Sequence, residues 1–303
     1  MLLERLLAGL EVVVAPFAVC DVRGSAHLAV PAADEATLHY VLAGAGTART
    51  PGAADVALRP HTFMVLPPGL AHRVEPARGS VIPELSCGDL AAGMRRISAG
   101  RGVHGVALAC GTIRATYRRG VGLFRYLRAP LVEALGDGDP LRHAFDAFLG
   151  ELAAPQPGTP ALAQALMTQC LVLLLRRRCQ GGECREPWLA ALDDDRLGTA
   201  VAAILEAPEA PFTVERLAAL AGMSRSAFAL RFAEAFGRPP MAFLKEVRLA
   251  RAAQMLRTSD LPVKRVAGAV GYASRSYFSR AFKAFHGLDP AAYRSRAEAP
   301  PPS

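Results

Sequence analysis

Long hydrophobic runs are missing from this chain of 303 residues. The apolar stretch Leu171–Leu175 stops at Arg176–Arg178 and is far shorter than the roughly 20 residues that a membrane span needs. The first residues, Met1–Arg5, hold an acid and a base before any apolar run, which is untypical of a signal peptide. We therefore expect a cytoplasmic protein.

Acidic residues are scarce in one part of the chain, its C-terminal third. Residues 210–296 hold 15 Lys and Arg against 5 Asp and Glu, whereas the remainder holds 20 basic and 22 acidic residues. The net charge of +8 therefore comes from this segment alone. Such a concentration of positive charge is typical of a segment that binds a polyanion, most often nucleic acid. A solvated basic surface is the alternative.

Catalytic constellations are also missing. The sequence has no phosphate-binding loop, nucleophile elbow or metal-binding cluster of convincing spacing, so we expect neither an enzyme nor a cofactor. The cysteines are scattered along a long chain, unlike the crowded cysteines of small disulfide-rich proteins, and most are expected to be reduced thiols. They are Cys20, Cys87, Cys110, Cys170, Cys179 and Cys184.

The spacing of apolar residues divides the chain into zones. Short strand-like runs separated by Gly, Pro and Asp fill residues 1–76, and residues 77–102 are interpreted as an irregular excursion. Apolar residues at three- and four-residue spacing then predict helices over 141–152 and 161–178. The predicted organisation is a β-rich sensor domain over 1–118, a helical dimerisation region over 119–178, a flexible linker over 179–192 and a helical domain over 193–297.

The C-terminal zone repeats itself at an offset of fifty residues. Matching positions include Ser224 and Ser274, Phe228 and Phe278, Phe232 and Phe282, Gly237 and Gly287, and Pro240 and Pro290. In each copy a short helix and a glycine-containing turn precede a second helix, which a serine caps and a glycine ends. This is the plan of a helix-turn-helix motif. A long helix over about 240–258 is predicted to join the two copies.

The repeat resembles a known family. Residues 212–296 are similar to the DNA-binding domain of AraC/XylS-type regulators, and the resemblance is carried by the segments 217–228, 248–256 and 266–282, followed by Gly287–Pro290. It implies two helix-turn-helix units in one chain that bind double-stranded DNA. The second helix of such a unit enters the major groove with its N-terminal residues nearest the bases.

Residues on the exposed first turns of the second helices are the candidate DNA contacts. By this resemblance Ser226, Ala229 and Leu230 match base-reading positions, and their small or apolar side chains favour contact with thymine methyls. Arg280 or Arg275 is suited to bidentate bonds with a guanine. The complete candidate set is Ser224, Arg225, Ser226, Ala229, Leu230, Arg231, Ser274, Arg275, Ser276, Tyr277 and Arg280. Further candidates, for phosphate contact, are Arg238, Lys245, Arg248 and Lys264.

The N-terminal zone resembles a cupin barrel, a sensor that regulators of this family often carry. The segment Leu66–His72 is similar to the second cupin motif, although His61 stands where that motif has glycine. The first motif keeps His39 but has Val41 where a second histidine is usual. We therefore favour barrel-lining histidines over a metal site at His39 and His72, with or without Glu75. An apolar effector pocket is an open alternative.

Two cysteines suggest what this domain senses. Cys20 precedes a predicted strand and Cys110 ends another, and cysteines at similar places occur in the reactive-chlorine-responsive activators of this family. The resemblance implies a redox sensor formed by Cys20 and Cys110, and buried inert thiols are the alternative. Cys179 and Cys184 form a weaker redox or metal candidate.

These observations predict an α+β protein of two domains: a cupin-like barrel with a helical extension, then an all-helical domain with two helix-turn-helix motifs. The predicted function is that of a sequence-specific transcription regulator, an activator, which senses a small molecule or an oxidant. The expected partners are double-stranded DNA, RNA polymerase and, through the helix over 161–178, a second copy of the chain. A cupin-type metalloenzyme fused to a DNA-binding domain is the alternative.

Overall fold

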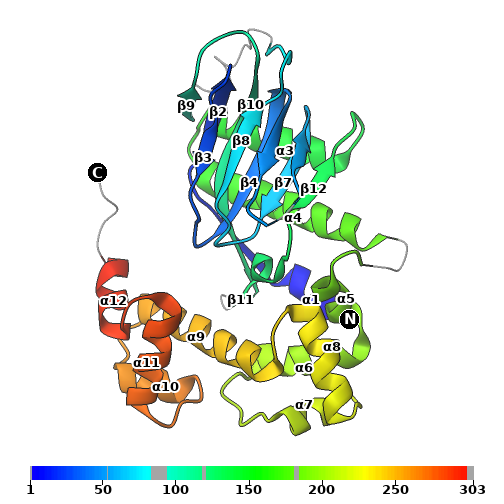
Figure 1. Ribbon diagram of the computed structural model, residues 1–303. Helices are drawn as coiled ribbons and strands as arrows, with labels where there is room; N and C mark the ends of the chain where they lie inside the picture. Colours follow the sequence, from blue (N-terminus) through cyan, green and yellow to red (C-terminus); the bar gives the residue numbers. More distant parts are fainter. Residues whose placement is uncertain (1, 53, 83–93, 118–120, 181–183, 299–303) are drawn as a thin grey trace. The chain divides into compact units, whose positions relative to one another are not determined.

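The computed structural model describes residues 2–52, 54–82, 94–117, 121–180 and 184–298, so Cys87 lies outside the described residues. The chain forms two compact units (Figure 1). One contains residues 11–115 and 123–178, and the other contains residues 1–10, 116–122 and 179–303. The predicted mixture of a strand-rich region and a helical domain is confirmed.

The first unit is built on two sheets. One has the order β12-β7-β4-β10-β2-β9, with β1 and β11 also paired to β10, and the other has the order β3-β8-β5-β6. Their apolar faces enclose a core that includes Val22, Val41, Leu66 and Leu108 from the first sheet and Val74 from the second. The strands are β1 (Leu10–Val14), β2 (Ala18–Arg23), β3 (Leu28–Val30), β4 (Ala36–Gly44), β5 (Gly46–Arg49), β6 (Val56–Leu58), β7 (Thr62–Leu66), β8 (His72–Pro76), β9 (Arg95–Ala99), β10 (Gly105–Tyr117), β11 (Val121–Gly122) and β12 (Leu131–Ala134).

Two helices complete this unit, and both were predicted. Helix α3 (Pro140–Ala153) packs Phe145 against Tyr40 of β4 and Phe63 of β7, with ring centroids 4.7 and 5.1 Å apart. Helix α4 (Thr159–Arg178) packs on α3. By length and composition alone α4 could also cross a membrane; one of its faces, with Met167, Cys170 and Leu171, is buried in this unit.

The second unit is helical and contains the predicted repeat. Phe228 and Phe232 are buried in the first copy, and Phe278 and Phe282 are buried in the second. Gly237 and Gly287 end the second helix of each copy with φ of 71° and 77°, which glycine adopts without steric cost. The helices are α1 (Leu2–Ala8), α5 (Pro187–Asp193), α6 (Asp195–Glu206), α7 (Val214–Leu220), α8 (Arg225–Phe236), α9 (Pro240–Thr258), α10 (Val263–Ala269), α11 (Arg275–His286) and α12 (Pro290–Glu298).

Three segments differ from the prediction. The flexible linker over 179–192 is wrong for its second half, because Pro187–Asp193 forms α5 and buries Trp188 and Leu189. The residues assigned to an irregular excursion include β9, which pairs in parallel with β2. The β-rich zone begins with a helix, α1, which contacts α5 and α6 in the second unit.

Candidate nucleic-acid interface and sensor site

The two candidate recognition helices begin alike. The Ser224 hydroxyl accepts a hydrogen bond from the Ala227 N–H at the start of α8, and the Ser274 hydroxyl accepts one from the Tyr277 N–H at the start of α11, both at 3.3 Å. These are N-caps, as the sequence predicts. Each cap leaves other N–H groups of the first turn unpaired, and that end of a helix favours an anion such as phosphate.

The predicted DNA contacts share the outer faces of α8 and α11. All are exposed except Ala229, which is half-buried. Leu230 is 62% exposed and Tyr277 is 54% exposed, so both side chains are accessible to a partner. Because the phenylalanines occupy the opposite face of each helix, these side chains point away from the core.

The charges on the two outer faces differ. On α8, Arg225 forms an ion pair with Glu215 of α7 at 3.0 Å. On α11, Arg275 and Arg280 form no ion pair with any residue that the structure describes. Among the candidate DNA contacts, α11 therefore has two uncompensated cations, Arg275 and Arg280, whereas α8 has Arg231 alone.

Two of the four phosphate candidates have structural partners instead. Arg238 forms an ion pair with Glu246 on α9. Arg248, also on α9, donates hydrogen bonds from Nε to the Pro208 carbonyl at 2.6 Å and from Nη2 to the Ala210 carbonyl at 2.9 Å. These partners satisfy the two guanidinium groups within the protein. Lys245 and Lys264 are exposed and stay candidates.

No local pattern in the sequence indicates a contact between the two halves of the repeat. The guanidinium of Arg248 lies 6.0 Å from the Tyr272 ring, so one side chain joins the loop before the first motif to the turn of the second. At Gly271 in that turn, a Cβ would lie 2.7 Å from the Glu209 carbonyl oxygen, and only glycine permits this approach. The repeat is thus connected by side-chain and backbone contacts as well as by α9.

The predicted sensor residues meet in the interior of the first unit. Cys110 on β10 lies opposite His39 on β4, and their Sγ and Nδ1 atoms are 3.1 Å apart. The Nε2 atom of His39 lies 2.6 Å from Nε2 of His72 on β8. Cys20 on β2 forms a hydrogen bond with Cys110 through their sulfurs. The four side chains therefore form one continuous hydrogen-bonded series, Cys20–Cys110–His39–His72, which we call the cysteine–histidine chain.

Burial governs the protonation of the cysteine–histidine chain. His39 is 1% exposed, and desolvation together with the neighbouring His72 lowers the pKa of His39 to about 3. Desolvation also lowers the pKa of His72 and raises that of Cys110 well above its ordinary value. The hydrogen bond from Cys110 lowers the pKa of Cys20. At neutral pH both imidazoles are therefore uncharged.

The donors do not fit the metal that many cupins hold. The two nitrogens of His39 point to different partners, His72 and Cys110, so the donors lie in a row and do not converge on one point. Two nitrogens that share a tetrahedral zinc are about 3.3 Å apart, farther than these. Glu75 forms ion pairs with Arg49 and Arg73. No group of three or more His, Cys, Asp or Glu among the described residues is arranged to hold a metal ion.

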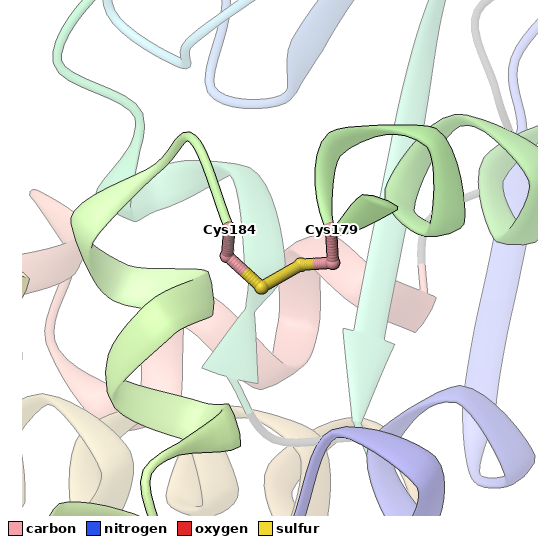
Figure 2. The surroundings of a disulfide bond; sticks show 2 residues. All are labelled: Cys179 and Cys184. Atoms are coloured by element: carbon pink, nitrogen blue, oxygen red, sulfur yellow. A yellow bond between two sulfur atoms is a disulfide. The ribbon is translucent and has the colours of Figure 1, made fainter. Parts of the chain in front are cut away.

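The remaining described cysteines lie apart from the cysteine–histidine chain. Cys179 and Cys184 form a disulfide in the segment between α4 and α5 (Figure 2), so the expectation of reduced thiols is wrong for this pair. Their separation of five residues makes their meeting local. Cys170 is a buried thiol on α4, and desolvation raises its pKa to about 12.

His61 stands where the second cupin motif has glycine, and its backbone has the positive φ that glycine adopts most easily. It has a φ of 65° and is the one non-glycine residue with positive φ among those described. Its Nδ1 lies 2.9 Å from the Tyr40 hydroxyl, which also donates to Asp146 on α3 at 3.3 Å. Burial raises the pKa of Tyr40. This polar contact ties the outside of the barrel to α3.

Comparison with known proteins finds one family match for the N-terminal part of the chain and one for the C-terminal part. Residues 2–180 match the family model described as Cupin, and residues 217–296 match the one described as Helix-turn-helix domain. The DNA-binding domain of AdpA, solved in complex with a target DNA, is 40% identical, with a TM-score of 0.33; the match covers 34% of this chain and 92% of that chain.

Two curated relatives illustrate the extent of similarity. An uncharacterized HTH-type transcriptional regulator of Haemophilus influenzae is 37% identical over 155 residues, 51% of this chain and 52% of that protein. RclR of Escherichia coli K12, described as an RCS-specific HTH-type transcriptional activator, is 31% identical over 266 residues, 85% of this chain and 84% of RclR. The chain belongs to the AraC-type family of transcription regulators, with an N-terminal cupin domain and a C-terminal helix-turn-helix domain that binds DNA.

Proposed function

We propose that this regulator is a cytoplasmic transcription activator that responds to an oxidant through Cys20 and Cys110. The observation that carries the proposal is the placement of Cys20 and Cys110 as diagonal neighbours on the paired strands β2 and β10. The similarity to an RCS-specific activator over most of both chains supports the same class of signal. RNA polymerase is the proposed protein partner at the promoter, and α4 is the proposed contact in a homodimer.

Oxidation of this pair would move the strands that carry it. Cys20 lies opposite Leu108, and Cys110 lies opposite Ala18, so the cysteines are diagonal neighbours on β2 and β10. Diagonal Cα atoms lie about 7–8 Å apart, beyond the upper limit of about 6.8 Å for a disulfide. A bridge therefore draws the two strands together. Because the last residues of β10, Thr116 and Tyr117, belong to the second unit, this strand offers a covalent route for the signal.

The DNA-binding part of the proposal assigns unequal roles to the two motifs. Helices α8 and α11 would enter successive major-groove segments about 34 Å apart. We assign direct base reading mainly to Arg275, Tyr277 and Arg280 on α11, where exposed cations have no internal partner. Ser226, Ala229 and Leu230 on α8 would contact thymine methyls or backbone.

Thiol trapping together with a promoter reporter tests the sensor. We expect a Cys20–Cys110 bridge and increased transcription after oxidant treatment, and we expect C20S and C110S to lose both. The variant C179S/C184S is the matched control, because it removes two cysteines outside the barrel and should respond like the parent. An oxidant that leaves Cys20 and Cys110 unbridged and promoter binding unchanged would refute the proposal.

A further inference from the structure

The protons along the cysteine–histidine chain have one consistent arrangement. The Nδ1 atom of His72 lies 3.3 Å from the Leu70 carbonyl oxygen, which accepts but cannot donate, so Nδ1 carries the proton. In neutral His72 the Nε2 atom is then an acceptor. Because Nε2 of His39 is 2.6 Å from it, His39 must carry its proton on Nε2. The remaining nitrogen, Nδ1 of His39, is left as an acceptor facing the Cys110 sulfur.

This arrangement fixes the role of both thiols. Nδ1 of His39 lies 3.1 Å from the Cys110 sulfur and is the acceptor for the Cys110 proton, and Cys110 is also hydrogen-bonded to Cys20. When His39 takes the Cys110 proton, Cys110 can take the Cys20 proton in turn, which leaves the negative charge on Cys20. The hydrogen bond between the two thiols lowers the pKa of Cys20 and raises that of Cys110, which favours Cys20 as the place of the negative charge.

We infer that His39 is the base that removes a proton from the Cys20–Cys110 thiol pair when the pair is oxidised, and that His72 is a positioning residue that holds the reactive tautomer of His39. The inference rests on the proposed function and adds to it how a buried thiol, Cys20, and a half-buried thiol, Cys110, become reactive. A thiol reacts as the thiolate, and burial opposes that form. A base in contact with the thiol removes this obstacle without requiring a thiolate at rest.

The oxidation balances with an N-chloramine as oxidant. His39 accepts a proton from the pair, the Cys20 thiolate attacks chlorine, an S–Cl bond forms and the N–Cl bond breaks. The amine that leaves takes the proton from His39. The Cys110 sulfur then attacks Cys20, an S–S bond forms, chloride leaves and the Cys110 proton passes through His39 to solvent. The two thiols lose two electrons, and chlorine is reduced to chloride.

The pH profile of thiol loss separates this role from a structural one. The titratable groups that act on His39 and the thiols are these residues themselves, namely His39, His72, Cys20 and Cys110. Because His39 stays neutral down to a pKa of about 3, the parent should lose its Cys20 and Cys110 thiols to taurine chloramine at a rate that changes less than about twofold between pH 5.5 and 7.5. In H39Q, which can accept a hydrogen bond but not the proton, the rate should rise about tenfold per pH unit with the thiolate fraction.

Two variants at His72 test its positioning role. H72L removes the acceptor for the Nε2–H of His39, and we expect a pH-dependent rate like that of H39Q. H72Q supplies an amide oxygen as acceptor and should restore the flat profile. Equal profiles in H72L and H72Q would contradict the role of His72, and a flat profile in H39Q would contradict that of His39.

The tautomers can be read in the unmodified reduced protein, so the test does not depend on whether a variant folds. Nitrogen-15 NMR should show His39 protonated on Nε2 and unprotonated on Nδ1, and a protonated Nδ1 would overturn the inference. Failure of the sensor proposal is distinguishable. If the parent forms the bridge but its rate of thiol loss rises steeply with pH, the role of His39 as base is rejected and the sensor proposal is kept. If the rate of thiol loss does not change with pH but neither a bridge nor a transcriptional response appears, the sensor proposal alone is rejected.

Discussion

Replacing Arg248 by methionine should destabilise the helical unit and loosen the connection between its two motifs. The change keeps the apolar stem of the side chain and removes the guanidinium, which binds the Pro208 and Ala210 carbonyls and lies near the Tyr272 ring. Hydrogen bonds from a charged donor contribute about 1.5–3 kcal/mol each. Because Ala210 is only half-buried and its carbonyl can regain water, we expect a total loss of about 2–4 kcal/mol in the free energy of unfolding.

Tryptophan fluorescence during urea unfolding measures this loss in the right unit. The chain has one tryptophan, Trp188, and it is 2% exposed in α5, which packs on α8. Its emission should shift when the helical unit unfolds. With a urea slope of about 2 kcal/mol per molar, in the middle of the usual range, R248M should lower the midpoint by about 1–2 M.

A neighbouring arginine supplies the control. Arg251 lies one turn along α9 and forms an exposed ion pair with Glu209 at 3.3 Å, a contact worth about 0–1 kcal/mol. R251A removes the same charge, so any general electrostatic effect is shared by the two variants. If R248M and R251A have equal, small effects on the midpoint, the reasoning about Arg248 is refuted.

Three further predictions concern the caps, base reading and acid stability. S274A should cost about 1 kcal/mol through loss of the N-cap of α11, measured by urea unfolding, and S274D should retain most of that stability. R280A should weaken binding to a selected DNA site by about 1–3 kcal/mol and relax the choice at one position, whereas a uniform loss on all sequences at fixed salt would show a phosphate contact instead. The folded-state pKa of His39 is depressed from 6.5 to about 3, so the unfolded chain binds the extra proton between these values and stability falls as the pH is lowered through that window. On acidification H39Q should therefore lose less stability than the parent. The difference should be up to about 1.4 kcal/mol per pH unit between pH 4 and 6, measured by circular dichroism of the barrel. Parallel pH curves of the two proteins would contradict a buried neutral imidazole at His39.

Local patterns were sufficient to predict the helical repeat. The caps at Ser224 and Ser274, the glycines at 237 and 287 and the bounds of α9 all follow from residues close together in the chain. Each of these signals acts through the backbone of its own helix, and therefore the sequence alone reveals it.

Segments whose structure depends on distant partners were missed. Strand β9 has four exposed residues in a row and no apolar alternation, so only its pairing with β2 makes it a strand. Helix α5 follows a linker-like segment and forms where Trp188 and Leu189 find apolar partners elsewhere in the chain. Tertiary packing overrides local composition in both cases.

The residues of the sensor site were predicted one by one, but their contacts within the cysteine–histidine chain were not. His39, Cys20 and Cys110 were each recognised, but their contact depends on the register of β4 against β10. That register shifts between Ala107 and Leu108, and the shift places His39 opposite Cys110. An irregularity of one residue changes which side chains meet across a sheet, and the sequence shows no sign of it.

Selection of binding sites from a randomised DNA duplex tests most directly that the two motifs form one bipartite reader. The purified chain should enrich an asymmetric site with two blocks of preferred bases, centred about 10–10.5 base pairs apart, as expected for two successive major-groove segments. Substitution at Arg280 should relax the block read by α11 and leave the other unchanged. Enrichment of a single block, or of two blocks without fixed spacing, would contradict the account.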